Sequence, residues 1–338
     1  MSTTRIFFKI SFIAIVIVLI VRGSHAAFPI QIVDCSYTEI GSNACAWSEE
    51  IPDQSFTILN ANIGNTLYSC RTYLNKLCLI DVENIITNSI ARLQPDIVVL
   101  QEILAPWQCQ TLTYDSENVC ALPQDIPQVG RILGDEYQIA CDSRNQFECV
   151  GIKFDVGSIL ECEVGYLCQT NRTIQNPKGC DPGFTASAVS IRMKDGFEFD
   201  LANLHLQSTS TTCRIETLKR LLLPDANGKI FLKRDAVLLA GDFNFDPWRS
   251  YNNTAIFWTQ IIENDWHDHG FVYHSGLVEA IPSHYTTFPL GIGRTVDFVI
   301  SNFAEGVLSV MGETPKTQRL DNGYGTDHRA LFGRLAYP

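Results

Sequence analysis

Several apolar runs in this chain stop abruptly on a carboxylate, a carboxamide or an imidazole. The clearest covers residues 238–248, LLAGDFNFDPW, where a segment suited to burial ends at Asp242 and Asn244. Such side chains are costly to bury unless they find hydrogen-bond partners or stand in a polar site. Any fold for this chain must therefore gather polar groups where its buried strands end.

Hydrophobic periodicity predicts strands that alternate with helices. The expected strands cover residues 55–63, 96–101, 184–193, 197–206, 236–240, 295–301 and 329–335, and the expected helices cover 79–93, 212–223 and 254–263. Residues 96–101, DIVVLQ, are apolar almost throughout, as in a strand covered on both faces. This pattern favours an α/β sandwich in which two packed β-sheets are flanked by helices.

The first 26 residues have the pattern of a secretory signal peptide. Arg5 and Lys9 precede an apolar run over residues 10–21, and small residues at 24 and 26 are spaced for cleavage. An uncleaved signal anchor is disfavoured, because this run is short against the roughly 20 residues that span a bilayer. We therefore expect a secreted, extracellular protein with one domain over residues 27–338 and no transmembrane segment after cleavage.

The charge balance limits the kind of partner that the mature chain can bind. The full chain has 25 basic and 37 acidic residues, and removal of residues 1–26 leaves 22 against 37, a formal charge of −15. An acidic surface argues against a nonspecific grip on a polyanion, although a metal ion in a cleft can supply positive charge locally.

Twelve cysteines lie between Cys35 and Cys213. Behind a signal peptide, an even number without zinc-finger spacing predicts disulfides, whose pairing the sequence leaves open. Seven of them fall within residues 109–180, where the strand pattern breaks, so we expect a cysteine-rich insertion of loops there. Sequons at Asn171 and Asn252 predict a glycoprotein.

The polar residues at the ends of the predicted strands form a set suited to one kind of chemistry. The set consists of Asn62, Glu102, Asn203, His205, Asp242, Asn244 and Asp297, together with Asp327 and His328 just before the last strand. Oxygen ligands suit Mg²⁺ or Ca²⁺, and histidines beside carboxylates suit proton transfer. A single residue of this kind is more often a helix cap or a buried residue whose hydrogen bonds are satisfied within the core. The presence of the whole set favours an active site.

Three motifs in this order resemble those of the endonuclease/exonuclease/phosphatase superfamily. They are LQE at 100–102, GDFN at 241–244 and DH at 327–328, and the resemblance extends over residues 56–335. It implies a four-layer αββα sandwich of two packed mixed β-sheets with helices on both sides. It also implies metal-dependent hydrolysis of a phosphoester at one edge, as in the deoxyribonuclease I and neutral sphingomyelinase branches.

By this resemblance, Glu102 is the principal ligand of Mg²⁺, or of Mn²⁺ or Ca²⁺, and Asn62 and Asp327 complete the surroundings of the metal. Asp242 is expected to orient or activate the attacking water, and Asn244 to bind the phosphoryl group.

The resemblance also gives roles to the histidines. Asp297 is expected to hold His328 in its cationic form, which stabilises the transition state, and His205 is expected to protonate the leaving oxygen. Asn203, beside His205, is expected to bind substrate. Apart from the resemblance, Arg294 is expected to contact a phosphate of the substrate, because it directly precedes the segment TVDF.

The resemblance therefore predicts a secreted phosphodiesterase whose partner is a phosphodiester, in nucleic acid or in a phospholipid headgroup. Inositol phosphates are an alternative substrate class, although the segments GDFNFDPWR and GRTVDF lack the usual features of that branch. A non-catalytic secreted binding protein on the same fold is the other alternative, and it has no need of the complete set of site residues. The sequence gives no sign of an obligate protein partner.

Overall fold

The computed structural model describes residues 53–64, 80–110, 119–123, 125–162, 167–174, 177–246, 272–273, 296–310, 328 and 330–338. All of these lie in one compact unit, Ile32–Pro338.

All of the described strands belong to two mixed β-sheets. The first sheet has the order β13 (Glu305–Val310), β14 (Leu331–Ala336), β1 (Ser55–Asn62), β2 (Ile97–Gln101), β4 (Cys149–Lys153), β3 (Tyr137–Asp142) and β6 (Leu167–Thr170). The second sheet has the order β11 (Val272–Tyr273), β12 (Asp297–Ser301), β10 (Val237–Asp242), β9 (Glu198–His205), β8 (Thr185–Met193) and β5 (Gly157–Ile159), with β7 (Thr173–Ile174) also paired to β8.

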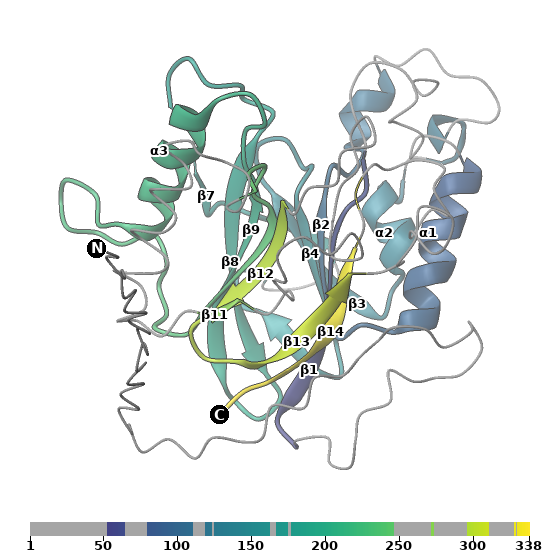
Figure 1. Ribbon diagram of the computed structural model, residues 1–338. Coiled ribbons are helices and arrows are strands. Elements are labelled where there is room, and N and C mark those ends of the chain that lie inside the picture. The colour runs from purple at the N-terminus through teal and green to yellow at the C-terminus, as the bar shows by residue number, and fades with distance from the viewer. Residues whose placement is uncertain are drawn as a thin grey trace, which may run out of the picture. The chain divides into compact units, whose positions relative to one another are not determined.

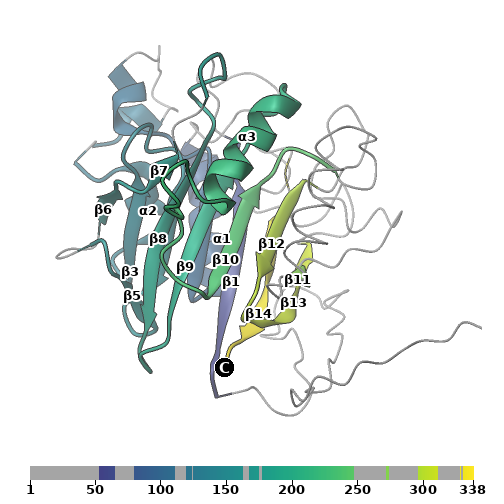
Figure 2. The ribbon, with the colours of Figure 1, turned by 90° about the vertical axis from the view of Figure 1, so that its left-hand side faces the viewer.

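Helices cover the outer faces of both sheets. Helices α1 (Ile80–Leu93) and α2 (Gln128–Leu133) lie on the first sheet, and α3 (Thr211–Leu222) lies on the second (Figure 1, Figure 2). Two short 3₁₀ helices, η1 (Pro106–Gln110) and η2 (Val119–Ala121), follow β2. The layers are helix, sheet, sheet and helix, so the predicted αββα sandwich is confirmed.

The alternation of side chains along each strand divides the apolar residues into separate cores. Phe56 and Ile58 of β1 point between the sheets with Leu201 of β9 and Leu238 of β10. Leu59, one residue on, points to the outer face of the first sheet. Because the period of a strand is 2, Asn62 continues the inner face of Phe56 and Ile58. The inner faces are therefore apolar along most of their length and become polar at one edge.

The predicted helices and strands agree with the structure wherever both are described. The prediction of a helix over 254–263 falls outside the described residues. Within the described part of the chain, no helix is both long and apolar enough to cross a membrane.

The predicted insertion of loops over residues 109–180 is wrong. This segment supplies β3, β4 and β6 to the first sheet and β5 and β7 to the second, and β4 lies between β2 and β3. Its strands are short and interrupted by cysteines, which concealed their periodicity. Four disulfides join described cysteines: Cys109–Cys120, Cys141–Cys149, Cys162–Cys168 and Cys180–Cys213. None of the described cysteines is free.

Gly241 allows β10 to approach β9 closely, just before Asp242. Its φ is +142°, and a Cβ atom there would lie 2.0 Å from the backbone oxygen of Leu204.

We expect Gly241→Ala to lower the free energy of unfolding by about 3 kcal/mol or more, because backbone atoms must move. Gly134→Ala is the matched control: φ is +75° and nothing lies within 4 Å of the added Cβ. That variant should lose less, about 1–3 kcal/mol, from its backbone conformation alone, since φ +75° with ψ −171° is a region that residues other than glycine rarely adopt. Urea unfolding of both variants measures the difference, and equal losses would contradict the close approach.

Candidate active site

The directions of the strands bring six of the predicted site residues to one edge of the sandwich: Asn62, Glu102, His205, Asp242, Asp297 and His328. In the first sheet β1 and β2 are parallel, and in the second β9 and β10 are parallel, so the carboxyl ends within each pair share an edge. Strand β12 runs antiparallel to β10 and begins at this edge, which pairs Asp297 with Asp242.

Asn62 joins the two sheets at this edge. Its amide nitrogen donates to Oε1 of Glu102, which follows β2, at 3.1 Å and to Oδ2 of Asp242 at 3.1 Å. Its amide oxygen accepts a bond of 3.0 Å from the backbone N–H of Gly64. Asn62 therefore holds a carboxylate of the first sheet beside a carboxylate of the second.

His328 forms a buried pair with Asp297. Its Nδ1 lies 2.8 Å from Oδ2 of Asp297, and its Nε2 lies 3.6 Å from Oδ2 of Asp242. A histidine that donates from Nδ1 to a carboxylate has a fixed ring orientation and tautomer. The two residues that the resemblance paired thus lie in contact, and the free ring edge points toward Asp242.

His205 also pairs with a buried carboxylate, which the sequence analysis missed. Its Nδ1 lies 3.2 Å from Oε1 of Glu148, whereas its Nε2 lies 3.5 Å from Oε1 of Glu102 and 3.9 Å from Oδ2 of Asp242. The rings of Phe184 and His205 make a T-shaped contact with centroids 4.7 Å apart. Glu148 immediately precedes β4. The sequence feature that could have revealed it is a carboxylate at the start of an apolar run, whereas the sequence analysis considered carboxylates at the ends of such runs.

Burial and charge act in opposite directions on this pair. Burial raises the pKa of Glu148 to about 7, and the hydrogen bond with His205 offsets part of this effect. Burial tends to lower the pKa of His205, but the bond to Glu148 and the nearby charges of Glu102 and Asp242 raise it to about 9. The imidazole has the higher pKa, so the proton of the pair resides on His205.

Asp242 and Asn244, the polar groups that end the buried strand β10, are hydrogen-bonded to each other. The backbone N–H of Asn244 donates to Oδ1 of Asp242 at 2.7 Å, and its side-chain amide donates to Oδ2 at 3.1 Å. Asn244 has a φ of +53°, a conformation that asparagine tolerates better than most residues. Burial raises the pKa of the Asp242 carboxyl, and the charge of His328 opposes this.

The side-chain amide of Asn244 also donates to the backbone oxygen of Leu206 at 2.8 Å. Both amide hydrogens are thus engaged within the protein. In this structure Asn244 orients Asp242, and its amide is not available to the phosphoryl group that the sequence analysis assigned to it.

Asn203, which was expected to bind substrate, lies between the two sheets. It is fully buried, its amide nitrogen donates to the backbone oxygens of Leu100 and Cys149, and its amide oxygen accepts from Gln101. These partners belong to the first sheet, so Asn203 links the sheets and does not face a substrate. Asp327 and Arg294 lie outside the described residues.

Glu102 fits the role of a cation ligand. Its Oε2 is buried and has no hydrogen-bond partner among the described residues, and burial raises the pKa of its carboxyl. A bound cation would satisfy this oxygen and favour the charged form. A second possible group is formed by Asp242, Asp297 and His328, whose ligand atoms lie within 4.8 Å of one another. There, however, Nδ1 of His328 already bonds Asp297. Glu102 is therefore the better anchor for a metal.

No protein-family model and no curated protein sequence matches the chain. Solved structures do match it in fold. An endonuclease/exonuclease/phosphatase family protein from Bacteroides thetaiotaomicron is 15% identical, with 86% of this chain and 100% of that chain covered and a TM-score of 0.53. The chain has the fold of this family.

Two further structures share the endonuclease/exonuclease/phosphatase fold with this chain. TDP2 from D. rerio, solved with a single-strand DNA product, is 17% identical, with coverage of 84% and 99% and a TM-score of 0.54. ANGEL2, described as a 2′,3′-cyclic phosphatase, is 14% identical, with coverage of 83% and 95% and a TM-score of 0.53. At these identities the likeness is one of fold.

The Glu148–His205 pair predicts a specific change in titration. Replacement of Glu148 by Gln removes the negative partner that raises the imidazole pKa, so the pKa of His205 should fall from about 9 toward its ordinary value near 6.5 or below. NMR titration of the histidine ring in metal-free buffer measures this. Glu216→Gln, on the exposed side of α3, should leave the value unchanged. A pKa of His205 that stays the same in Glu148→Gln would contradict the pairing.

Proposed function

We propose that the chain is a secreted phosphodiesterase that depends on a divalent metal ion and hydrolyses its substrate by attack of an activated water. The observation that carries the proposal is the arrangement around one oxygen. Oδ2 of Asp242 lies 3.6 Å from Nε2 of His328 and 3.9 Å from Nε2 of His205, and each histidine has its own buried carboxylate.

Hydrolysis of a phosphodiester needs a proton acceptor for water, positive charge beside the phosphorus and a proton donor for the leaving oxygen. Asp242 suits the first task, because burial raises the pKa of its carboxyl and makes it a stronger base. His328, held by Asp297, suits the second. His205 suits the third, since it carries a proton and Glu148 orients it.

Glu102 and Asn62, together with Asp327, would hold the ion. Mg²⁺ is the proposed ion, with Mn²⁺ or Ca²⁺ as alternatives. When bound, such an ion polarises a phosphoryl oxygen and neutralises charge that develops in the transition state. We keep Arg294 as a proposed substrate contact.

The substrate class that we propose is a phosphodiester, in nucleic acid or in a phospholipid headgroup. The fold likeness to TDP2 with its DNA product supports the nucleic-acid alternative. A non-catalytic binding protein would need no pair of histidines each held by a buried carboxylate, so the geometry favours the enzyme.

Secretion is part of this proposal. The predicted signal peptide over residues 1–26 and the four disulfides among the described residues support an oxidising compartment. Asn171, in the predicted sequon, is exposed between β6 and β7 and is open to glycosylation, whereas Asn252 lies outside the described residues. We propose one mature domain over residues 27–338.

The metal assignment predicts that Glu102→Gln abolishes most activity. Loss of the negative ligand should lower kcat/KM at least ~100-fold on plasmid DNA or sphingomyelin, whichever the wild type hydrolyses, because the ion supplies several kcal/mol of charge stabilisation. A chelator should inactivate the wild type, and added Mg²⁺ should restore it. Glu216→Gln is the control and should keep wild-type activity. Full activity of Glu102→Gln, or of the wild type in chelator, would contradict the proposal.

The two histidines should differ in their dependence on the leaving group. His205→Ala should lower kcat/KM for a diester with an alkoxide leaving group far more than for a nitrophenyl diester, which needs little protonation. His328→Ala should lower both alike, because charge at phosphorus is common to them. Steady-state kinetics on the two substrates test this, and equal losses in His205→Ala would remove the general-acid role.

A further inference from the structure

The hairpin of β3 and β4 delivers Glu148 to the active site. Strand β3 ends at Asp142 and β4 begins at Cys149, so the loop between them covers residues 143–148 and Glu148 is its last residue. Cys141 and Cys149 face each other in the register of the hairpin and form a disulfide.

Asp142 holds the backbone of this loop from its first residue onward. Oδ1 accepts from the backbone N–H groups of Arg144 at 3.0 Å and Asn145 at 2.7 Å. Oδ2 accepts from those of Phe147 at 2.9 Å and Glu148 at 3.2 Å. Asp142 is fully buried. One carboxylate thus organises the path of the whole loop, and its last bond reaches the residue that pairs with His205.

The loop in turn touches both sheets at the active-site edge. The backbone oxygen of Phe147 accepts from the N–H of Ile103 at 3.0 Å, directly after Glu102. On the other side, Oε2 of Glu148 accepts from the hydroxyl of Thr185 at 2.7 Å. A shift of the loop would therefore move Glu148 relative to His205.

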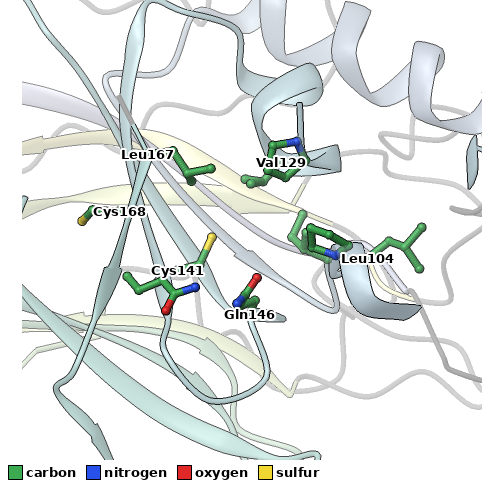
Figure 3. A pocket seen from close by; sticks show the side chains of 10 residues that line it. Leu104, Val129, Cys141, Gln146, Leu167 and Cys168 are labelled. Atoms are coloured by element: carbon green, nitrogen blue, oxygen red, sulfur yellow. The ribbon is translucent and has the colours of Figure 1, made fainter. Parts of the chain in front are cut away.

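Side chains outside the loop contribute few contacts to it: the indole N–H of Trp107 donates to the backbone oxygen of Asn145 at 3.2 Å, and the Trp107 ring lies near that of Phe147 with centroids 5.7 Å apart. A cavity of about 190 Å³ lies beside the loop, and Gln146 of the loop and Cys141 of β3 are among the residues that line it (Figure 3). Asp142 accepts from four of the six backbone N–H groups of residues 143–148, so its carboxylate is the main hydrogen-bonding group that sets the path of the loop.

We propose that Asp142 is a positioning residue of the active site: by holding loop 143–148 it keeps the Glu148 carboxylate against Nδ1 of His205. Asp142 itself contacts neither histidine nor substrate. The inference rests on the proposed function, in which His205 donates a proton to the leaving oxygen.

The chain offers a matched control for a buried carboxylate that only stabilises the fold. Asp200 is also fully buried, and it binds the side chains of Arg172 and Ser190 and the backbone N–H of Lys233. It lies near the start of β9, at the opposite end of the strand from His205. Asp200→Asn should lower stability without a selective effect on proton donation.

The test compares Asp142→Asn with Asp200→Asn on the alkoxide and nitrophenyl diesters, with rates corrected for the folded fraction. Asp142→Asn should lower kcat on the alkoxide diester at least ten times more than on the nitrophenyl diester and should leave KM nearly unchanged. Added to His205→Ala, it should cause no further selective loss. Asp200→Asn should lower the corrected rates on both substrates equally or not at all. Equal losses on both diesters in Asp142→Asn would overturn the proposal.

A second pair of variants serves if Asp142→Asn does not fold. Removal of the Cys141–Cys149 disulfide by two Ser substitutions frees both ends of the loop and should give the same selective loss. Removal of Cys162–Cys168, which closes a short loop of comparable span, should not. Equal behaviour of the two double variants would overturn the proposal.

A readout independent of activity separates this proposal from the proposed function. In NMR spectra, the Nδ1 proton of His205 should give a downfield signal that Asp142→Asn shifts or removes and Asp200→Asn preserves. If the wild type hydrolyses no diester, the proposed function fails, and this signal alone decides the positioning role. A signal unchanged in Asp142→Asn would reject it.

Discussion

The candidate site depends on the contact that Asn62 makes across the two sheets. Its amide reaches Glu102 of the first sheet and Asp242 of the second, at 3.1 Å each. None of these residues lies near the others in the sequence, and each lies at or directly after the end of a different strand. The site therefore exists only when the inner faces of the sheets are packed in one relative register. Its assembly is driven by the apolar part of those faces, which is buried completely below it.

A second polar layer behind the site fixes this register. Gln101 donates to the side-chain oxygens of Asn60 at 3.1 Å and Asn203 at 2.9 Å, and Asn60 donates to the backbone oxygen of Gly241 at 3.4 Å. Buried amides add little net stability, but a sheet that slid by one residue would leave them unpaired at a cost of about 1–3 kcal/mol each. We infer that this layer selects the alignment in which the site residues meet, while the apolar layers supply the stability.

The sequence was sufficient to predict those site residues whose position depends only on the strand that carries them, because the end of an apolar run marks the end of the strand. Asp242 was found because an apolar run ends on it. Glu148 was missed because its position depends on strand order: β4 runs antiparallel to β2, so its first residue lies at the edge where β2 ends. No local pattern shows that β4 enters the sheet between β2 and β3. The same lack of strand order made residues 109–180 look like an insertion and made Asn203, which bonds the opposite sheet, look like a neighbour of substrate.

Glu148 adds a fourth carboxyl to the charge balance of the site. Four acidic groups, Glu102, Glu148, Asp242 and Asp297, surround two imidazoles within one mostly buried cluster. With both histidines protonated and all four carboxyls ionised, the cluster has two negative charges in excess. Burial resists such an excess, and this is why it raises the pKa values of Glu102 and Asp242 in the metal-free protein. One divalent cation at Glu102 would balance the excess without removing a proton from either histidine. The ion would thereby offset the burial that raises the pKa of Asp242 and would favour the ionised form of this proposed base. The surrounding carboxylates, which raise the pKa of His205, would keep that imidazole protonated as the proposed acid.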